Sequence, residues 1–159
     1  MRLLLLAVGR MKAGPERDLL KRYVDRAQAG ARGVGLAAVS DIEIEESRAR
    51  TAPERKAAEA AVLATKIPAG AKVLLLDERG RAATSLELAK AVGTARDGGC
   101  PAFCFAVGGP DGFAPDFMAG HDLIAFGGVT FPHQIVRVLV AEQLYRITTI
   151  LAGHPYHRA

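Results

Sequence analysis

The sequence predicts an α/β fold, in which a mostly parallel β-sheet carries helices on both faces. Short apolar runs alternate with longer segments of helical periodicity along the whole chain. Most of the apolar runs lack polar alternation, which is typical of strands buried on both faces. The 159 residues, 50% of them hydrophobic and 24% charged, suit one ordinary core, so we expect residues 1–159 to form a single domain.

Five strands are predicted from the apolar runs. The first run also resembles a secretory signal, but it is short, lacks a small-x-small cleavage site and leads into Arg10 and Lys12. A buried first strand is therefore the preferred interpretation. No run approaches the roughly 18 apolar residues that a membrane-spanning helix requires. The predicted strands cover residues 3–8, 34–39, 73–77, 102–107 and 122–126.

Four helices are predicted, each opening on residues that favour a helix start. The patterns Thr51-x-x-Glu54 and Thr84-x-x-Glu87 are capping boxes, in which hydroxyl and carboxylate groups bond the free amides of the first turn. The other two helices open on proline, whose missing N–H would have no partner there. These two are expected to run from near Pro15 to Gly30 and from Pro132 to near Gly153.

The chain is mildly basic, with a net charge of +4. Arg17, Lys21, Arg22 and Arg26 are spaced to share much of one surface of the first predicted helix. This surface is either an ordinary solvated helix face or a footprint for a phosphate backbone.

Two glycine-rich segments follow predicted strands. VGGPDG, residues 107–112, follows the fourth strand, and FGGVTFPH, residues 126–133, follows the fifth. Open parallel sheets bind ligands outside the carboxyl ends of their strands. Paired glycines at that edge allow the backbone to approach a ligand closely, or they serve only tight turns that need positive φ.

Several common chemistries lack their motif. There is no G-x-x-x-x-G-K-[ST] phosphate loop, and GRMKAG follows the first strand in place of the dinucleotide fingerprint G-x-G-x-x-G. H-E-x-x-H and G-x-S-x-G are absent as well, and the two cysteines match neither a zinc site nor a redox pair, so no metal site is predicted. Such a pair of cysteines indicates a reducing, cytoplasmic setting. What remains is a pocket built largely from backbone and apolar groups.

The last predicted helix carries two polar residues at its N-terminal end, beside an apolar arc that must pack on the sheet. His133 lies one turn before Arg137. Helix N-termini favour anions, and the arginine fork matches phosphate oxygens. The alternatives are a capping role for His133 with Arg137 in a surface ion pair, or a contact with a second subunit along the small and polar residues nearby.

The sequence closes on GHPYHRA, residues 153–159, which holds two histidines, a tyrosine and an arginine but no apolar anchor. Chain ends commonly fray, and the hydrophobic effect alone would not hold this one to a surface. Either polar partners order these side chains or they are idle.

VGGPDG, TFPHQIVRVLVAEQLYR and GHPYHR, in a chain of this length that begins with a short LLLLAVG strand, together resemble the RlmH family. Its members are small SPOUT-class enzymes that methylate N3 of a pseudouridine in large-subunit ribosomal RNA. The resemblance spans essentially the whole chain and implies a C-terminal trefoil knot, a feature that the general rarity of knots argues against. It also implies bound S-adenosylmethionine, a homodimer, and ribosomal RNA as the partner.

The same resemblance implies which residues hold the cofactor. Relatives often carry serine or another side chain where this sequence has Gly127 and Gly128. Cofactor contacts made through the backbone survive that change, whereas side-chain contacts do not. The implied cofactor residues are Leu76, Gly108, Gly109, Phe126, Gly127, Gly128, Val129, Thr130 and Phe131.

The resemblance further implies that the terminal residues dock near the cofactor of the partner subunit and on the RNA. Tyr156 can stack on a base or hydrogen-bond it, and His157 can reach a base edge. His133 or His157 can accept the N3 proton, since histidine titrates near neutral pH. Arg137 or Arg158 can instead stabilise the developing negative charge, and Arg158 can hold phosphate. These five residues are the expected catalytic set.

Two other functions stay open. A catalytically silent factor that binds the ribosome through the same basic surface predicts RNA binding without affinity for S-adenosylmethionine. A nucleotide-binding enzyme of flavodoxin-like topology predicts a mononucleotide with its phosphate at VGGPDG instead. Affinity for S-adenosylmethionine therefore separates the methyltransferase from both.

Overall fold

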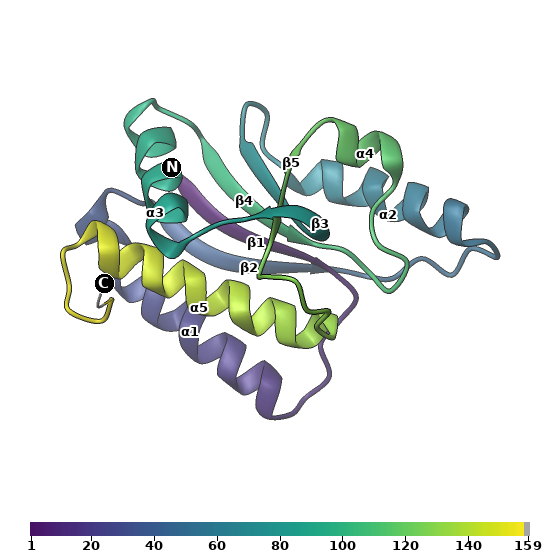
Figure 1. Ribbon diagram of the computed structural model, residues 1–159, viewed down its shortest axis with the longest axis horizontal. Coiled ribbons are helices and arrows are strands. Elements are labelled where there is room, and N and C mark those ends of the chain that lie inside the picture. The colour runs from purple at the N-terminus through teal and green to yellow at the C-terminus, as the bar shows by residue number, and fades with distance from the viewer. Residues whose placement is uncertain (158–159) are drawn as a thin grey trace.

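A computed structural model describes residues 1–157 of the chain (Figure 1). At its centre is a five-stranded sheet in the order β2-β1-β4-β3-β5, in which every pair of neighbouring strands is parallel. The predicted α/β class with a parallel sheet is therefore confirmed. The strands are β1 (Arg2–Val8), β2 (Ala38–Ile44), β3 (Lys72–Ala82), β4 (Ala102–Val107) and β5 (Asp122–Ala125).

Helices cover both faces of the sheet (Figure 1). Because side chains alternate along a strand, Leu3 and Leu5 of β1 pack with one set of helices and Leu4 and Leu6 with the other. All four leucines are at most 1% exposed, and the burial of each contributes roughly 1.5–3 kcal/mol. The first set is α1 (Pro15–Ala31), α3 (Ser85–Asp97) and α5 (His133–Leu151), and the second is α2 (Ala52–Lys66) and α4 (Pro115–Ala119).

Local signals located the helix starts well. Both predicted capping boxes form, at Thr51 with Glu54 and at Thr84 with Glu87, and α1 begins at Pro15. α5 begins one residue later than predicted, since Pro132 is its N-cap. Among the described residues, no helix is both long and apolar enough to span a bilayer.

The strand predicted at residues 34–39 is misplaced. α1 runs on into a short 3-10 helix, η1 (Arg32–Val34), and Gly35 then turns the backbone with a φ of 73°. β2 begins only at Ala38 and lies at the edge of the sheet, paired with β1 alone. An edge strand is partly exposed to water and does not require an unbroken apolar run. The search for apolar runs therefore did not locate β2 correctly. The five-residue helix α4 was missed because it is too short to show a helical period.

β3 is longer than predicted, and its second half crosses β5. The pairing of these strands shifts between Leu76 and Arg81, and Arg81 then lies beside Ile124. At Gly80 the two segments touch backbone to backbone, because a Cβ there would lie 2.5 Å from both the carbonyl carbon and the amide nitrogen of Ile124. Only a residue without a side chain fits this crossing.

Candidate functional site

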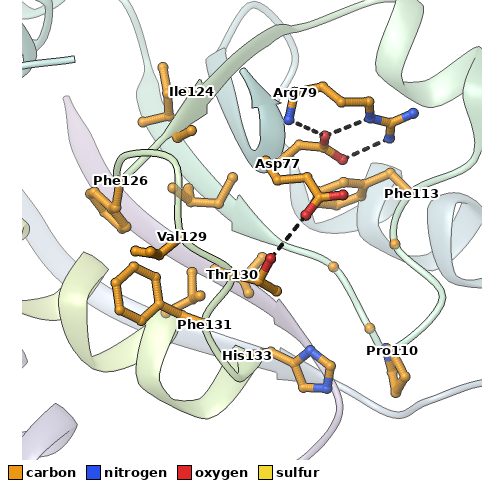
Figure 2. A pocket seen from close by; sticks show the side chains of 18 of the residues that line it. Asp77, Arg79, Pro110, Phe113, Ile124, Phe126, Val129, Thr130, Phe131 and His133 are labelled. Carbon is orange, nitrogen blue, oxygen red and sulfur yellow. Dashed lines mark hydrogen bonds and ion pairs between the residues drawn. The ribbon is translucent and has the colours of Figure 1, made fainter. Parts of the chain in front are cut away.

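A pocket of about 340 Å³ opens at the carboxyl ends of β4 and β5, beside the middle of β3, where the sequence predicts ligand binding (Figure 2). Its volume lies in the range of small-molecule sites. The lining comes from residues 76–79 in the middle of β3, residues 107–113 at and after the end of β4, and the segment from β5 into α5. Of the residues expected to hold the cofactor, all except Gly128 line this pocket.

The first glycine-rich loop, residues 107–112, exposes backbone to the pocket. A turn within it is closed by a hydrogen bond from the Gly112 amide to the Gly109 carbonyl, 2.9 Å long. Gly109 is packed from below, since a Cβ there would lie 3.0 Å from Val8 and 3.2 Å from Glu59 Oε2. The absence of a side chain therefore lets the loop settle on β1 and α2 while its peptide groups line the pocket.

The second glycine-rich loop, residues 126–131, contributes apolar surface. Figure 2 shows Phe126, Val129 and Phe131 gathered on one side of the pocket. The Thr130 hydroxyl donates a hydrogen bond of 3.3 Å to Glu78 Oε2, which joins this loop to the middle of β3. Gly127 has a φ of 105°, a conformation that favours glycine, so this residue shapes the loop as well as lining the pocket.

A carboxylate sits in the opposite wall of the pocket. Asp77, whose side chain is only 10% exposed, accepts hydrogen bonds from Arg79 Nε and Nη2, both 2.8 Å long (Figure 2). The Arg79 guanidinium lowers the pKa of Asp77, so this carboxyl group is ionised at neutral pH. The pocket therefore combines peptide groups, apolar side chains and the Asp77–Arg79 ion pair.

His133 and Arg137, which the sequence places one turn apart on the last helix, point to different places. His133 is the first residue of α5 and lines the pocket (Figure 2). Arg137 is 3% exposed and lies outside the lining, under the ends of β1 and β2. Its Nη2 donates to the Val8 carbonyl and its Nη1 lies 3.3 Å from Glu43 Oε1. Its Nε finds no hydrogen-bond partner among residues 1–157.

Arg137 thus ties α5 to the edge of the sheet. It forms an ion pair, as one of the alternatives anticipated, but the arginine of that pair is buried while Glu43 stays 25% exposed. Burial lowers the pKa of the Arg137 guanidinium from its ordinary value, while Glu43 opposes that shift. Arginine remains protonated even so, and the charge is held beside the first turns of α5.

Replacing Arg137 by methionine is expected to lower the free energy of unfolding by about 2 kcal/mol, because Val8 and Glu43 lose a buried charged donor. Glu43 is 25% exposed and keeps a bond from the Met11 amide, which limits the loss. Thermal unfolding should show a decrease of roughly 4–8 °C. Lys21→Met is the matched control, since Lys21 pairs with Asp25 on the surface. Equal melting temperatures for the two variants would contradict the structural role of Arg137.

The terminal residues Tyr156 and His157 lie against the C-terminal half of α5. The Tyr156 hydroxyl donates to Glu142 Oε1 at 3.0 Å, and His157 Nδ1 lies 3.3 Å from Arg146 Nη1. The Tyr156 ring also packs 4.6 Å from that of Tyr145, measured between centroids. These contacts support the interpretation that polar partners order the chain end. Arg158, the remaining residue of the expected catalytic set, lies outside the described residues.

Burial and the Glu142 carboxylate raise the pKa of Tyr156 to about 12. Its phenol is therefore protonated at neutral pH and is a hydrogen-bond donor, not a base. Glu142 follows His133 by nine residues, about 14 Å along the helix axis. Figure 1 shows the last described residues beside the end of α5 that is remote from the loop leading into it. Within one chain, the terminal residues and the pocket are thus apart.

Sequence reasoning missed the side chains that support the pocket. Arg55 on α2 forms an ion pair of 2.7 Å with Asp111 in the first glycine-rich loop, and Glu59 lies beneath Gly109. These partners are about 50 residues apart in the chain, so no local pattern links them. The only available signal was an acidic residue inside a glycine-rich loop. No group of metal-ligating side chains occurs within the part of the chain that the structure describes.

Comparisons with known proteins agree on one family. A family described as "Predicted SPOUT methyltransferase" matches residues 1–157. A protein of Methylobacterium nodulans named "Ribosomal RNA large subunit methyltransferase H" is 54% identical over 159 residues, covering 99% of this chain and 98% of the relative. Proteins of the same name from Methylobacterium sp. strain 4-46 and Xanthobacter autotrophicus are 56% and 53% identical, covering 99% and 100% of this chain and 98% and 100% of those relatives.

One solved structure, described as a putative methylase family protein from Neisseria gonorrhoeae, aligns with a TM-score of 0.48 and 14% identity. The alignment covers 99% of this chain and 87% of that one. The family assignment rests on the sequence relatives and the family match alone.

Proposed function

The chain belongs to the SPOUT methyltransferase family, and from this premise we propose that it transfers the methyl group of S-adenosylmethionine to N3 of a pseudouridine in 23S ribosomal RNA. The observation that carries the proposal is one pocket in which the middle of β3 and both glycine-rich loops meet. The family implies a trefoil knot. The close backbone contact where β3 crosses β5 at Gly80 supports that expectation. Ile124, at this crossing, also lines the pocket.

The residues of the pocket fit S-adenosylmethionine. The loop at residues 107–112 offers peptide groups to polar edges, while Leu76, Phe126 and Phe131 offer apolar surface to a purine ring. The Asp77–Arg79 ion pair adds charged hydrogen-bonding groups to the wall of the pocket. When bound, this cofactor supplies a methyl group on a positively charged sulfur, which makes that carbon an electrophile. The task of the protein is then to hold a nucleophile in line with it.

The nucleophile requires removal of a proton, because N3 of pseudouridine is protonated at neutral pH. His133, at the rim of the pocket, is placed to accept that proton. Arg137 acts from below as a positioning residue, since it anchors the first turns of α5, which carry His133, to the end of β1. Arg158 stabilises the negative charge that develops on the pseudouridine ring when N3 loses its proton. His157 is the second candidate for the proton acceptor.

A homodimer completes the site. In its own chain Tyr156 packs on Glu142, about 14 Å along α5 from His133, so a second copy has to bring its terminal residues to the pocket. The partner's Tyr156 then donates a hydrogen bond to a base or stacks on it. The mildly basic chain suits a phosphate-rich partner. The substrate is the large-subunit RNA, within the ribosome in the cytoplasm.

Calorimetric titration with S-adenosylmethionine tests the proposal directly. The wild-type protein should bind it, and Gly109→Val should weaken binding at least about 30-fold, roughly 2 kcal/mol, because the new side chain collides with Val8 and Glu59 and displaces the loop. Gly33→Val is the matched control, because a Cβ at Gly33 meets no atom within 4 Å.

The alternatives predict other results in the same experiment. A silent RNA-binding factor shows no heat with S-adenosylmethionine although it binds RNA. A nucleotide-binding enzyme takes up a mononucleotide in preference. Absence of S-adenosylmethionine binding by the folded wild-type protein would exclude the methyltransferase.

A further inference from the structure

We propose that Arg55 of α2 is a positioning residue for the cofactor, because it holds the first glycine-rich loop in its binding conformation through Asp111. The inference rests on the proposed function, and it assigns a role to a side chain that lies outside the pocket lining. Three observations carry it: a bidentate ion pair, a set of backbone ties made by the same guanidinium, and the buried carboxylate of Glu59 one helical turn further on.

The ion pair joins α2 to the loop by two parallel hydrogen bonds. Arg55 Nε donates to Asp111 Oδ2 at 2.7 Å, and Arg55 Nη2 donates to Asp111 Oδ1 at 3.1 Å. The two side chains are 30% and 26% exposed, so solvent screens their attraction only in part. A fork of this kind fixes direction as well as distance, which a single point charge does not. The carboxylate of Asp111 is therefore held in one orientation.

The same guanidinium also binds the segment that precedes α2. Arg55 Nη1 donates to the carbonyls of Ala49 and Arg50, at 3.2 and 3.4 Å. Arg55 thus connects helix α2, residues 49–50 and the loop at residues 107–112. Within the described residues, every hydrogen bond of its guanidinium goes to residues 49–50 or to Asp111 of the loop.

Glu59 supports the loop from beneath. It is 5% exposed, and its Oε1 accepts a hydrogen bond of 2.9 Å from the Ser47 amide. Its Oε2 lies 3.2 Å from the position that a Cβ on Gly109 would take. Because Arg55 and Glu59 are four residues apart, they lie on one face of α2. That face provides the surface on which the glycine-rich loop rests.

The loop needs such support because it has few side chains with which to hold itself. The loop has no side-chain contacts from its glycines, Gly108, Gly109 and Gly112, and Pro110 is exposed. Asp111 is therefore the polar side chain through which the loop is bound to α2. A loop that is already ordered loses less conformational entropy when a ligand binds. The Arg55 guanidinium lowers the pKa of Asp111, so the tie persists throughout the neutral pH range.

Titration calorimetry with S-adenosylmethionine on the full chain measures the effect. Arg55→Ala is expected to weaken binding about tenfold, which corresponds to about 1.4 kcal/mol. Arg55→Lys should weaken binding nearly as much, because lysine keeps the charge but not the fork. Lys56→Ala is the matched control, since Lys56 adds only a long-range attraction to Asp111, and it should bind within about twofold of wild type.

A double-mutant cycle separates this role from a general loss of stability. Asp111→Asn alone should weaken binding by a similar factor, and Arg55→Ala added to it should have little further effect. The melting temperature of each ligand-free variant shows whether it is folded at the titration temperature. Unchanged affinity of folded Arg55→Ala, or full rescue by Arg55→Lys, would overturn the proposal.

Hydrogen exchange on the ligand-free protein provides a readout that does not depend on the cofactor. Amides of residues 107–113 should exchange faster in Arg55→Ala than in wild type, while amides of β1 should not. Equal exchange in the loop refutes the positioning role. Failure of the wild-type protein to bind S-adenosylmethionine refutes the proposed function instead, so the two failures are distinguishable.

Discussion

Gly80→Ala is expected to lower the free energy of unfolding by about 3 kcal/mol or more, the largest effect on stability that we predict for a single methyl group. Its Cβ would lie 2.5 Å from two backbone atoms of Ile124, and backbone at the crossing of two strands has no room to move aside. β3 and β5 would have to separate where they cross. Thermal unfolding should show a decrease of roughly 6–12 °C, or the protein should fail to fold.

Gly33→Ala is the matched control for this experiment, because it adds the same methyl group where no atom lies within 4 Å. Its melting temperature should stay close to that of the wild-type protein. Because Ile124 also lines the pocket, Gly80→Ala should lose affinity for S-adenosylmethionine along with stability. A Gly80→Ala protein as stable as Gly33→Ala would show that the crossing is looser than the structure indicates.

Removing residues 156–159 is expected to decrease RNA methylation at least about 1,000-fold, because the truncated protein loses Tyr156, His157 and Arg158 together. Affinity for S-adenosylmethionine should change less than about threefold, since no described residue of this segment lines the pocket. The measurements are methyl transfer to ribosomal RNA and calorimetric titration of the cofactor. Full activity in the truncated protein would refute the assignment of the terminal residues.

The truncation also removes the contacts of Tyr156 with Glu142 and Tyr145, so stability is measured beside activity. Tyr156→Phe provides a finer control, because it removes only the hydroxyl group and keeps the aromatic ring. In the wild-type protein the Tyr156 phenol has a pKa of about 12 and is not a base. The dependence of activity on pH between 6 and 9 should therefore be the same in Tyr156→Phe as in the wild type.

Mixing two inactive proteins tests whether each site borrows from both chains. In a mixed dimer of the truncated chain and the Gly109→Val chain, one site combines an intact pocket with an intact terminal segment. Activity should recover to a fraction of that of the wild type, although neither protein is active alone. No recovery, with mixed dimers confirmed by mass, would count against a shared site.

Much of the site was predictable because its elements are local in sequence. The paired glycines after β4 and β5 marked the pocket, since parallel strands bring their carboxyl ends to one edge. The capping boxes at Thr51 and Thr84 marked two helix starts, because a cap needs only residues three apart. Length and apolar runs were sufficient for the α/β class. The resemblance of the glycine-rich and terminal motifs to one family was confirmed by relatives more than 50% identical.

Only the tertiary structure decided how distant residues meet. It turned Arg137 away from the pocket and buried it against Val8, although its spacing from His133 placed both at one helix end. It also joined Arg55 to Asp111 and laid Gly80 against Ile124, contacts between segments 56 and 44 residues apart. Periodicity reports which side of a helix is apolar, but it carries no information about which partner that side meets. That partner depends on strand order and on the close approach of backbones, which arise only when the whole chain packs.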